Sequence, residues 1–249
     1  MGLIQKSFSQ ERIFLDNKNK LDIEYIKLEG AGIRAKIAII SDIHSSFSKE
    51  LTEIICKNSP DLLLICGDIL YGADYLRFRD MCEHIEKVSE KVKVIISLGN
   101  HDFRKINGNS LKSCFSTPNI IILDNSYIYI NDLIIYGYTK KPEEPLFTPS
   151  NLPKNKRKTI FMCHNPMDFV KNPDLKKAGF LLTVSGHCHG GQWRIGNRGV
   201  YAPGQGIFPR YTSGFYLDNS LFVSRGITNT VNIPRFNNPS HIAFLEFNI

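Results

Sequence analysis

The chain has 249 residues, of which 42% are hydrophobic and 22% are charged, so its composition is that of a globular protein with a buried core. This composition excludes a disordered chain and a fibrous one. The formal net charge of +7 fits an anionic substrate, a nucleic acid or an acidic membrane surface about equally well. We expect one domain spanning residues 1–249.

No segment has the apolar length of a membrane span, and the first twenty residues are too polar for a signal peptide. We therefore expect a cytoplasmic protein, with peripheral contact at a membrane or phospholipid surface left open. The six cysteines form no C-x-x-C pair and are expected to be reduced thiols. Cys163 and Cys188 adjoin histidines, but neighbours on an extended segment point to opposite faces, so both thiols should face away from those rings.

The first hundred residues alternate between predicted strands and helices, which is typical of a βαβ layer with a mainly parallel sheet. In chain order, the predicted elements are an edge strand at 21–28, a strand at 35–41, a helix at 47–58 capped by Ser45 or Ser46, a strand at 62–66, a helix at 75–89 and a strand at 94–96. Hydrophobic residues at helical spacing give the second helix a buried face.

After residue 118 the alternation of strands and helices ends, and the predicted strands are short and close together in the sequence. They span 119–123, 127–130 and 133–136, with Asn131 and Asp132 as a two-residue hairpin turn. Residues 140–158 carry four prolines and form a predicted surface loop of the kind that often binds or covers a substrate. The tail after Trp193 is rich in glycine, proline and aromatic residues, with strands expected at 221–224 and 243–247.

Acid and histidine motifs follow five apolar runs that predict strands, at 38–40, 62–66, 94–96, 160–162 and 181–184. In chain order, they are Asp42 with His44, Asp68 after Gly67, the run Gly99-Asn100-His101-Asp102, His164, and the run Gly186-His187-Cys188-His189. Side chains at the carboxyl ends of strands in an open sheet are both rigidly placed and accessible, and ligands bind there. Motifs this far apart in the sequence are therefore expected to converge on one site.

Mixed oxygen and imidazole ligands suit Mn, Fe, Zn, Co or Ni, with Mn expected here, and disfavour a thiolate zinc site. Seven ligands are too many for one ion. Two ions about 3.5–4 Å apart share a carboxylate and form a clamp for in-line displacement at phosphorus. Asp68, which lies centrally in the motif order after Gly67, is the natural bridge.

The histidine that is left over, His101, could donate a proton to a leaving alkoxide, because an imidazole titrates near neutral pH. Asp102 could orient that ring by accepting its other N–H. Arg210 and Arg225 are candidates for contacts with a substrate phosphate, since a guanidinium matches two phosphate oxygens. A structural or surface role for each arginine remains open.

Taken together, these motifs resemble those of the calcineurin-like metallophosphoesterases, whose order is D-x-H, G-D, G-N-H-D/E, H and G-H-x-H, and the match covers residues 35–189. The resemblance implies a four-layer α-β-β-α sandwich of two mixed β-sheets flanked by helices. From the residues alone, a single doubly wound sheet is equally consistent. The resemblance also implies His101 as catalytic acid and two sets of metal ligands, namely Asp42, His44, Asp68 and His189 for one ion and Asp68, Asn100, His164 and His187 for the other.

The run from Gly186 to Gln192 further resembles a small bacterial branch of phosphodiesterases that carries G-H-T-H-G-G-Q, with Cys188 in place of the threonine. We therefore predict a dinuclear metal-dependent phosphoesterase that hydrolyses a phosphodiester or pyrophosphate bond with a metal-bridging hydroxide. One alternative is a nuclease or another nucleic-acid-processing phosphodiesterase, although the sequence contains no recognisable nucleic-acid module. A second alternative is a non-catalytic binding scaffold. The physiological substrate and the oligomeric state are not predicted.

Overall fold

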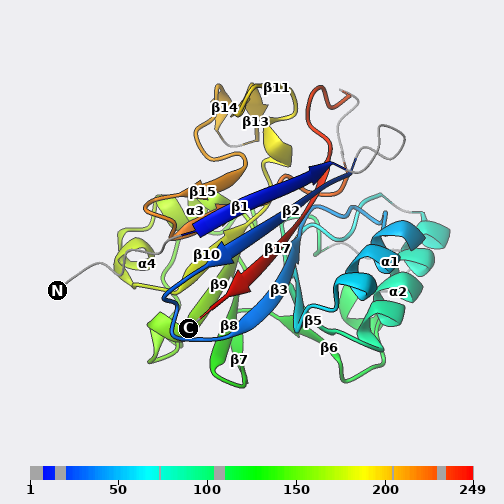
Figure 1. Cartoon of the computed structure of the whole chain (residues 1–249), viewed down its shortest axis with the longest axis horizontal. Helices are drawn as coiled ribbons and strands as arrows, with labels where there is room; N and C mark the ends of the chain where they lie inside the picture. The colour runs from blue at the N-terminus through cyan, green and yellow to red at the C-terminus, as the bar shows by residue number, and fades with distance from the viewer. Residues whose placement is uncertain are drawn as a thin grey trace.

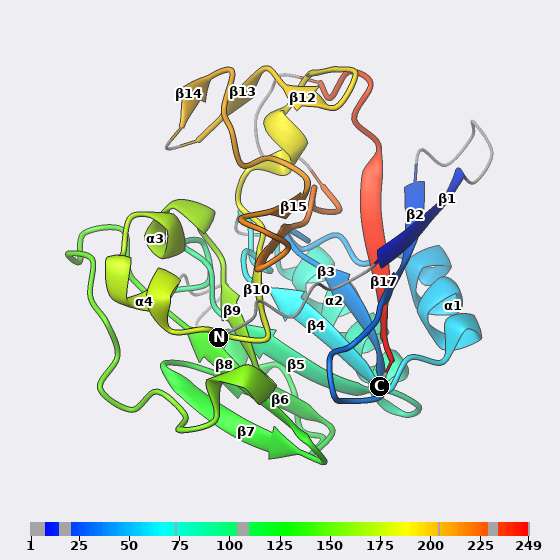
Figure 2. The same ribbon diagram turned by 60° about the vertical axis from the view of Figure 1, so that its left-hand side comes forward.

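A computed structural model of the chain describes residues 8–14, 21–72, 74–103, 110–203, 205–228 and 234–248. Two mixed β-sheets lie face to face at its centre (Figure 1, Figure 2). The first has seven strands in the order β1-β2-β17-β3-β4-β5-β6. Their bounds are β1 Phe8–Phe14, β2 Leu21–Leu28, β17 Ser240–Phe247, β3 Ala35–Ile40, β4 Leu62–Cys66, β5 Lys93–Ser97 and β6 Ile120–Leu123.

The second sheet has six strands in the order β15-β16-β10-β9-β8-β7. Their bounds are β15 Gly214–Tyr216, β16 Leu221–Val223, β10 Leu182–Ser185, β9 Thr159–Cys163, β8 Leu133–Tyr138 and β7 Ser126–Ile130. Two small hairpins stand apart from both sheets, at the top of Figure 1. They pair β11 Arg194–Ile195 with β12 Arg198–Gly199, and β13 Tyr201–Ala202 with β14 Gly206–Ile207.

Helices cover the outer sides of both sheets. Helices α1 Lys49–Asn58 and α2 Tyr75–Ser89 pack on the first sheet, and the short helices α3 Pro166–Val170 and α4 Pro173–Lys177 pack on the second. Three 3-10 turns complete the elements: η1 Leu111–Ser113, η2 Lys156–Lys158 and η3 His189–Gly191. This arrangement confirms the four-layer α-β-β-α prediction and excludes a single doubly wound sheet. Among the described residues, no helix is long and apolar enough to cross a membrane.

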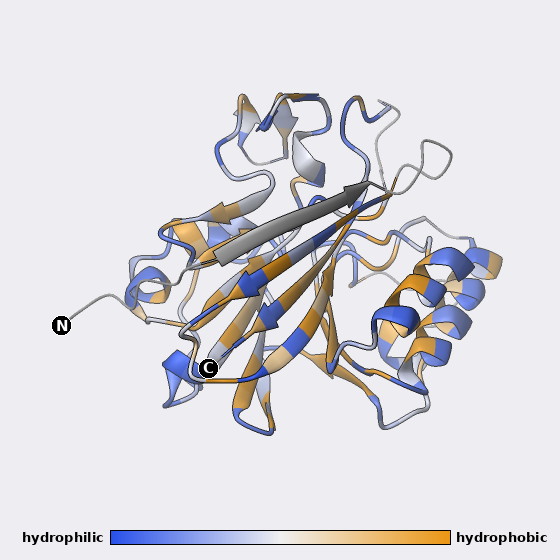
Figure 3. Cartoon of the chain, viewed as in Figure 1, coloured by the Kyte–Doolittle hydropathy of each residue, from blue (hydrophilic) through white to orange (hydrophobic). Residues whose placement is uncertain are grey.

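The apolar runs of the first sheet form strands that are buried on both faces, as expected for parallel strands covered on each side. Successive side chains of a strand point to opposite faces. Ile39 and Leu64 accordingly lie in the core between the sheets, whereas Ile40 and Leu63 pack against α1 and α2. In Figure 3 the central strands are mainly apolar, whereas α1 and α2 carry both apolar and polar residues.

Two predictions about the first sheet and its first helix were wrong. Strand β2 is not an edge strand, because it pairs with β1 on one side and β17 on the other. Helix α1 begins at Lys49, since Ser48 is its N-cap and accepts a hydrogen bond from Leu51 N at 3.1 Å. The Oγ atom of Ser45 instead accepts from Tyr71 N at 3.1 Å, so Ser45 joins two loops of the site.

Other local predictions are confirmed. Helix α2 spans the predicted residues and buries the predicted face, and residues 131 and 132 form the turn that joins β7 to β8. Asn131 has a φ of 51°, a conformation that asparagine tolerates better than most residues. Within residues 140–158 the described structure is loop and turn up to η2.

The expectation of six reduced thiols was wrong for one pair, because Cys82 and Cys114 form a disulfide that joins α2 to the segment after η1. Their Cα atoms are 6.2 Å apart, within the usual range for such a bond. The other four cysteines are free, and Cys163 and Cys188 are buried in the core behind the second sheet. Both thiols therefore face away from the neighbouring histidines, as predicted.

One buried ion pair and one buried carboxylate–imidazole hydrogen bond connect β2 to the segments beside it. Asp22 pairs with Arg225, and Glu24 Oε2 lies 2.9 Å from His241 Nε2 on β17. All four side chains are at most 6% exposed. Burial, followed by the charge of Arg225, lowers the pKa of His241 below its usual value. Charges this deep in a protein are tolerated only because they are paired.

Replacing Asp22 with alanine would leave the buried Arg225 guanidinium without its counter-charge. We expect Asp22→Ala to lower the free energy of unfolding in urea by about 3–5 kcal/mol. The control is Asp132→Ala, which removes an exposed carboxylate that lies 2.9 Å from Lys158 Nζ and should cost less than about 1 kcal/mol. Equal losses for the two variants would contradict a stabilising role for the buried pair.

Candidate metal centre

The five predicted motifs converge at one end of the two sheets. Asp42 and His44 follow β3, Asp68 follows β4, and Asn100 follows β5 in the first sheet. His164 follows β9, and His187 and His189 follow β10, in the second sheet. Within each sheet these strands are parallel, so their carboxyl ends share an edge. The site therefore lies where the edges of the two sheets meet.

The carboxylates and imidazoles form two clusters, and within each cluster the ligand atoms lie within 4.8 Å of one another. The first cluster consists of Asp42, His44 and His189, and the second consists of Asp68, His164 and His187. Asp42 Oδ1 is 3.7 Å from His189 Nε2 and 4.0 Å from His164 Nε2, so one carboxylate lies between the two clusters.

The backbone of this site is strained. Five of the seven predicted ligands have positive φ angles, in the region that favours glycine: Asp42 at 49°, His44 at 50°, Asp68 at 54°, His187 at 68° and His189 at 45°. Each such residue costs on the order of 1–3 kcal/mol, and such strain persists where the surrounding structure holds it at a functional site. The strain turns each loop sharply after its strand, which aims the side chains inward.

Two glycines of the motifs allow the loops to pack closely. A Cβ atom on Gly99 would lie 2.3 Å from Asp68 Oδ1, and one on Gly186 would lie 2.7 Å from Asp42 Oδ2. Any larger residue at either position would displace a carboxylate of the site. Each of these two glycines therefore makes room for a carboxylate that belongs to another motif.

The carboxylates also hold loops of other strands. Both oxygens of Asp42 accept a hydrogen bond from His187 N, at 3.1 and 3.0 Å, and Ser41 Oγ donates to Oδ2 at 2.6 Å. Asp68 Oδ1 accepts from His101 N at 2.9 Å. Asp42 thereby joins the two sheets, and Asp68 joins the loops after β4 and β5.

The donor set fits metal ions. His44 Nε2 and Asn100 Oδ1 are buried and make no hydrogen bond to any residue that the structure describes, as expected for atoms reserved for an ion. The Nδ1 atoms of His164 and His189 lie 2.8 Å from Cys66 O and 3.1 Å from Thr228 O. These outer hydrogen bonds fix the tautomer and leave each Nε2 atom facing the site.

Burial and charge set the protonation of these groups. Burial lowers the pKa of His44 and of His187 to about 4 each, so both rings are neutral near pH 7, the form that binds a metal. Burial would raise the pKa of Asp42 and Asp68, but the surrounding histidines bring both below the usual value. Burial also opposes protonation of His164, yet the Asp68 carboxylate raises its pKa to about 10. The cluster thus carries negative charge that a cation would neutralise.

His101 lies at the rim of the site with 22% of its side chain exposed. Its Nε2 atom is 3.9 Å from Asp68 Oδ2, and its ring packs edge-on against His44 with centroids 5.3 Å apart. Tyr71, which sequence analysis did not single out, lies beside both rings. Its ring centroid is 5.6 Å from that of His44 and 5.9 Å from that of His101. The ring of His101 therefore faces the metal ligands from the solvent side.

Asp102 holds the loops of the site through backbone contacts. Its Oδ1 accepts from Ile69 N and Leu70 N at 2.7 and 2.9 Å, and its Oδ2 accepts from Gly99 N at 2.8 Å. Burial and the Asp68 charge raise its pKa to about 7. These contacts favour a role in fixing the loops after β4 and β5. Orientation of the His101 ring by Asp102 stays a prediction.

The two arginines predicted as phosphate contacts differ in position. Arg225 is buried and paired with Asp22, which favours a structural role over a phosphate contact. Arg210 is exposed, with its guanidinium 5.6 Å from the centre of the Tyr211 ring.

A third arginine, Arg235, was missed by sequence reasoning. Its guanidinium donates to three backbone carbonyls, those of Arg225 at 2.9 Å, Gly226 at 3.2 Å and Thr228 at 2.7 Å. The Thr228 carbonyl is also the partner of His189 Nδ1. Arg235 therefore supports the loop that orients a predicted metal ligand. No local pattern marks it, because it follows His189 by 46 residues.

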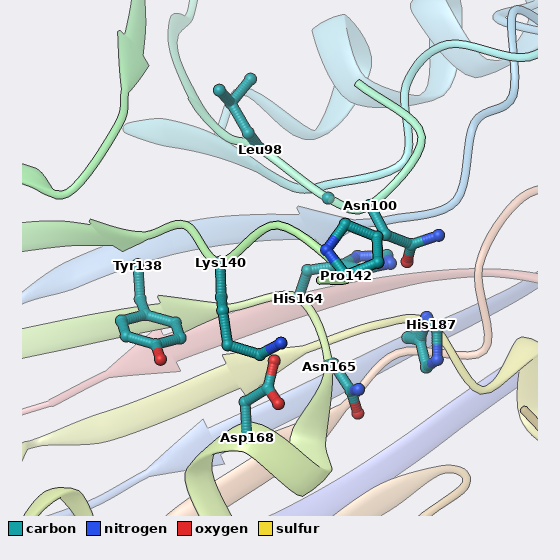
Figure 4. Close-up of a pocket in the computed structure, with 10 residues that line it drawn as sticks. Leu98, Asn100, Tyr138, Lys140, Pro142, His164, Asn165, Asp168 and His187 are labelled. Carbon is teal, nitrogen blue, oxygen red and sulfur yellow. The ribbon is translucent and has the colours of Figure 1, made fainter. Parts of the chain in front are cut away.

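A cavity of about 270 Å³ opens beside the second cluster (Figure 4). Asn100, His164 and His187 line its metal-site wall, and Tyr138, Lys140 and Asp168 line the remainder. In Figure 4 the Lys140 ammonium and the Asp168 carboxylate point toward one another. Burial raises the pKa of Asp168, and the charge of Lys140 acts in the opposite direction. Lys140 and Pro142 belong to the proline-rich loop that was predicted to lie near a substrate.

The chain is similar to several known proteins. The phosphodiesterase YaeI of Escherichia coli is 24% identical over 232 residues, which cover 85% of this chain and 81% of that protein. The uncharacterized protein YpbG of Bacillus subtilis is 27% identical over 202 residues, which cover 78% of this chain and 73% of that protein. Among solved structures, the E. coli phosphoesterase YfcE has 17% identity and a TM-score of 0.38, over 82% of this chain and 85% of that one.

The model of the family described as calcineurin-like phosphoesterase matches residues 35–191, which include all seven predicted metal ligands. The family and the similarity to the phosphodiesterase YaeI indicate a metal-dependent phosphoesterase. Because the match covers more than half of the sequence, the chain belongs to the calcineurin-like phosphoesterase family.

Proposed function

We propose that this protein hydrolyses a phosphodiester or pyrophosphate bond at a centre of two divalent metal ions. The observation that carries the proposal is the pair of adjacent clusters, each with one carboxylate and two imidazoles, with Asp42 Oδ1 4.0 Å from His164 Nε2 of the other cluster. One ion would be held by Asp42, His44, Asp68 and His189. The second would be held by Asp68, Asn100, His164 and His187, and Mn²⁺ suits both sets.

When bound, the two ions would supply a hydroxide nucleophile at neutral pH and neutralise charge on the phosphoryl oxygens. The chain supplies the geometry for this chemistry. The buried backbone hydrogen bonds to Asp42 and Asp68 and the outer partners of His164 and His189 fix the ligands before a substrate arrives. Such preorganisation avoids rearrangement during the reaction.

We assign proton transfer to His101. Its ring faces the ligands from the exposed side, where the leaving oxygen of a substrate would emerge. An imidazole at that position can donate a proton to an alkoxide as the bond to phosphorus breaks. Tyr71 lies beside the ring and limits its movement.

The cavity beside the second cluster supports a substrate with two substituents on phosphorus. This cavity, lined in part by Tyr138, Lys140 and Asp168, could hold one substituent while the other extends to solvent. The ammonium of Lys140 could neutralise a second phosphate group, as in a pyrophosphate. This favours a diester or pyrophosphate over a monoester.

The experiment that tests this function compares two synthetic esters with metal-stripped protein, before and after Mn²⁺ is added. We expect no turnover without metal, and after Mn²⁺ addition a higher kcat/KM for bis-p-nitrophenyl phosphate than for p-nitrophenyl phosphate. Mg²⁺ should restore less activity, because imidazole ligands suit it poorly. No turnover of either ester with two ions bound per chain would contradict the proposal. Faster cleavage of a plasmid than of the small diester would support the nuclease alternative.

The role of His101 predicts a dependence on the leaving group. His101→Ala should lower kcat by about 10²–10⁴-fold for a phenyl diester, whose leaving group needs a proton. The loss should be much smaller for a p-nitrophenyl diester, whose leaving group is stable as an anion. His187→Ala is the comparison variant, and it should lose bound metal, measured by elemental analysis, together with activity on both esters. Loss of metal in His101→Ala, or equal losses on both esters, would exclude the proton-transfer role.

A further inference from the structure

The exposed apolar residues of this protein are concentrated at one end. Thirteen large hydrophobic side chains are exposed among the described residues, and six of them lie in two nearby segments. These six are Trp193, Ile195, Tyr201, Ile207, Phe208 and Phe236. We call the described residues of 193–210 and 234–236 the cap. It includes the β11–β12 and β13–β14 hairpins, which project beyond both sheets in Figure 1 and Figure 2.

The most exposed of these side chains lie next to hairpin turns. Ile195 is 72% exposed beside Gly196, and Ile207 and Phe208 are 73% and 70% exposed after Gly206. Both glycines have positive φ angles and open space around them, and Gly196 lies in the β11–β12 turn while Gly206 begins β14. Six exposed apolar residues gathered in two hydrogen-bonded segments, unlike single exposed residues, indicate a binding surface.

The charge of the cap has one sign. The sequence contains no aspartate or glutamate from Leu175 to Leu217, and the cap contributes arginines to this stretch. Arg198 and Arg210 are exposed, whereas Arg194 is buried and donates to Gly190 O and Asn197 O at 2.7 and 2.6 Å. The exposed face of the cap is therefore apolar with positive charge at its border.

The cap is joined rigidly to the metal site. Trp193 Nε1 donates to Pro234 O at 2.8 Å, and Arg194 N donates to Phe236 O at 3.0 Å, so the two segments form one unit. Trp193 follows the ligand His189 by four residues, which places their Cα atoms at most about 14 Å apart. The end of the cap that contains Trp193 therefore lies close to the candidate metal centre.

The positive charge and the apolar side chains of the cap favour one kind of partner over the others. In a symmetric dimer through the cap, the arginines of two copies would meet with no carboxylate from either cap to neutralise them. A nucleic acid would match the arginines but would offer little to the exposed isoleucine side chains of the two hairpins. An anionic bilayer offers phosphates to the arginines and acyl chains to the isoleucines, and tryptophan and tyrosine are enriched at its interface.

We propose that the cap docks on the surface of an anionic phospholipid membrane. Ile195, Ile207 and Phe208 enter the boundary between headgroups and acyl chains, and Arg198 and Arg210 contact lipid phosphates. The metal centre then lies close to the headgroup layer. This inference does not depend on the proposed activity, because it concerns binding alone.

The test is sedimentation of the full-length protein with sucrose-loaded vesicles. We expect binding to vesicles that contain phosphatidylglycerol, weaker binding to pure phosphatidylcholine, and loss of binding as salt is added. Ile195→Ser combined with Phe208→Ser should lower the partition coefficient at least about tenfold, because two apolar anchors are removed. Arg198→Gln should lower it about fivefold, the effect of one basic residue near an anionic surface.

The matched control is Leu76→Ser combined with Tyr129→Ser, at positions that are 78% and 64% exposed on α2 and β7, away from the cap. This variant should bind vesicles as the unchanged protein does, and thermal unfolding should show that all variants are folded. Failure to bind anionic vesicles, or equal losses in the control, would overturn the proposal. So would a dimer, detected by light scattering, that the cap substitutions dissociate, because a second copy would then be the partner.

Discussion

Two buried carboxylates, Asp42 and Asp68, impose the constraint on which the rest of the site depends. Burying ionised groups is costly unless each oxygen has a partner. Here the partners come from the other loops, namely the His187 and His101 backbone amides, the Ser41 hydroxyl and the imidazoles of both clusters. The loops of the two sheets must therefore close around these carboxylates. That requirement accounts for the strained φ angles of five ligands and for the glycines that lie against the carboxylate oxygens.

The convergence of the seven candidate ligand residues could be predicted from the sequence because each belongs to a short motif at the end of an apolar strand. Rigid strands place such motifs at one edge, so local order predicts convergence. The limits of helix α2 and the β7–β8 turn were also predictable, since hydrophobic spacing and turn residues are local signals.

Several features could not be predicted from the sequence, because they depend on contacts between segments that are far apart in the chain. Arg225 looked like a phosphate ligand, but its partner Asp22 lies 203 residues away. Arg235 supports the His189 loop from a tail without any motif. The Cys82–Cys114 disulfide forms because α2 and the segment after η1 lie together, which the spacing of 32 residues does not reveal. The α1 cap was misplaced because Ser45 is engaged in holding Tyr71. In each case a tertiary contact outweighs a local preference.

Specificity is expected to come from the parts that lie around the ligands, since the ligands themselves define only the chemistry. The cavity with Lys140 and Asp168 lies on one side of the metal centre, and the cap follows directly from His189. A substrate phosphate at the metals would thus be close both to a small polar cavity and to the surface that we propose meets a membrane.

In the function that we propose, the two clusters form one dinuclear centre. Electron paramagnetic resonance of protein reconstituted with Mn²⁺, with the bound metal quantified in the same sample, tests this most directly. The account predicts two manganese ions per chain and the multiline spectrum of an exchange-coupled pair. One manganese ion per chain, or two that give only the six-line spectrum of isolated ions, would contradict it.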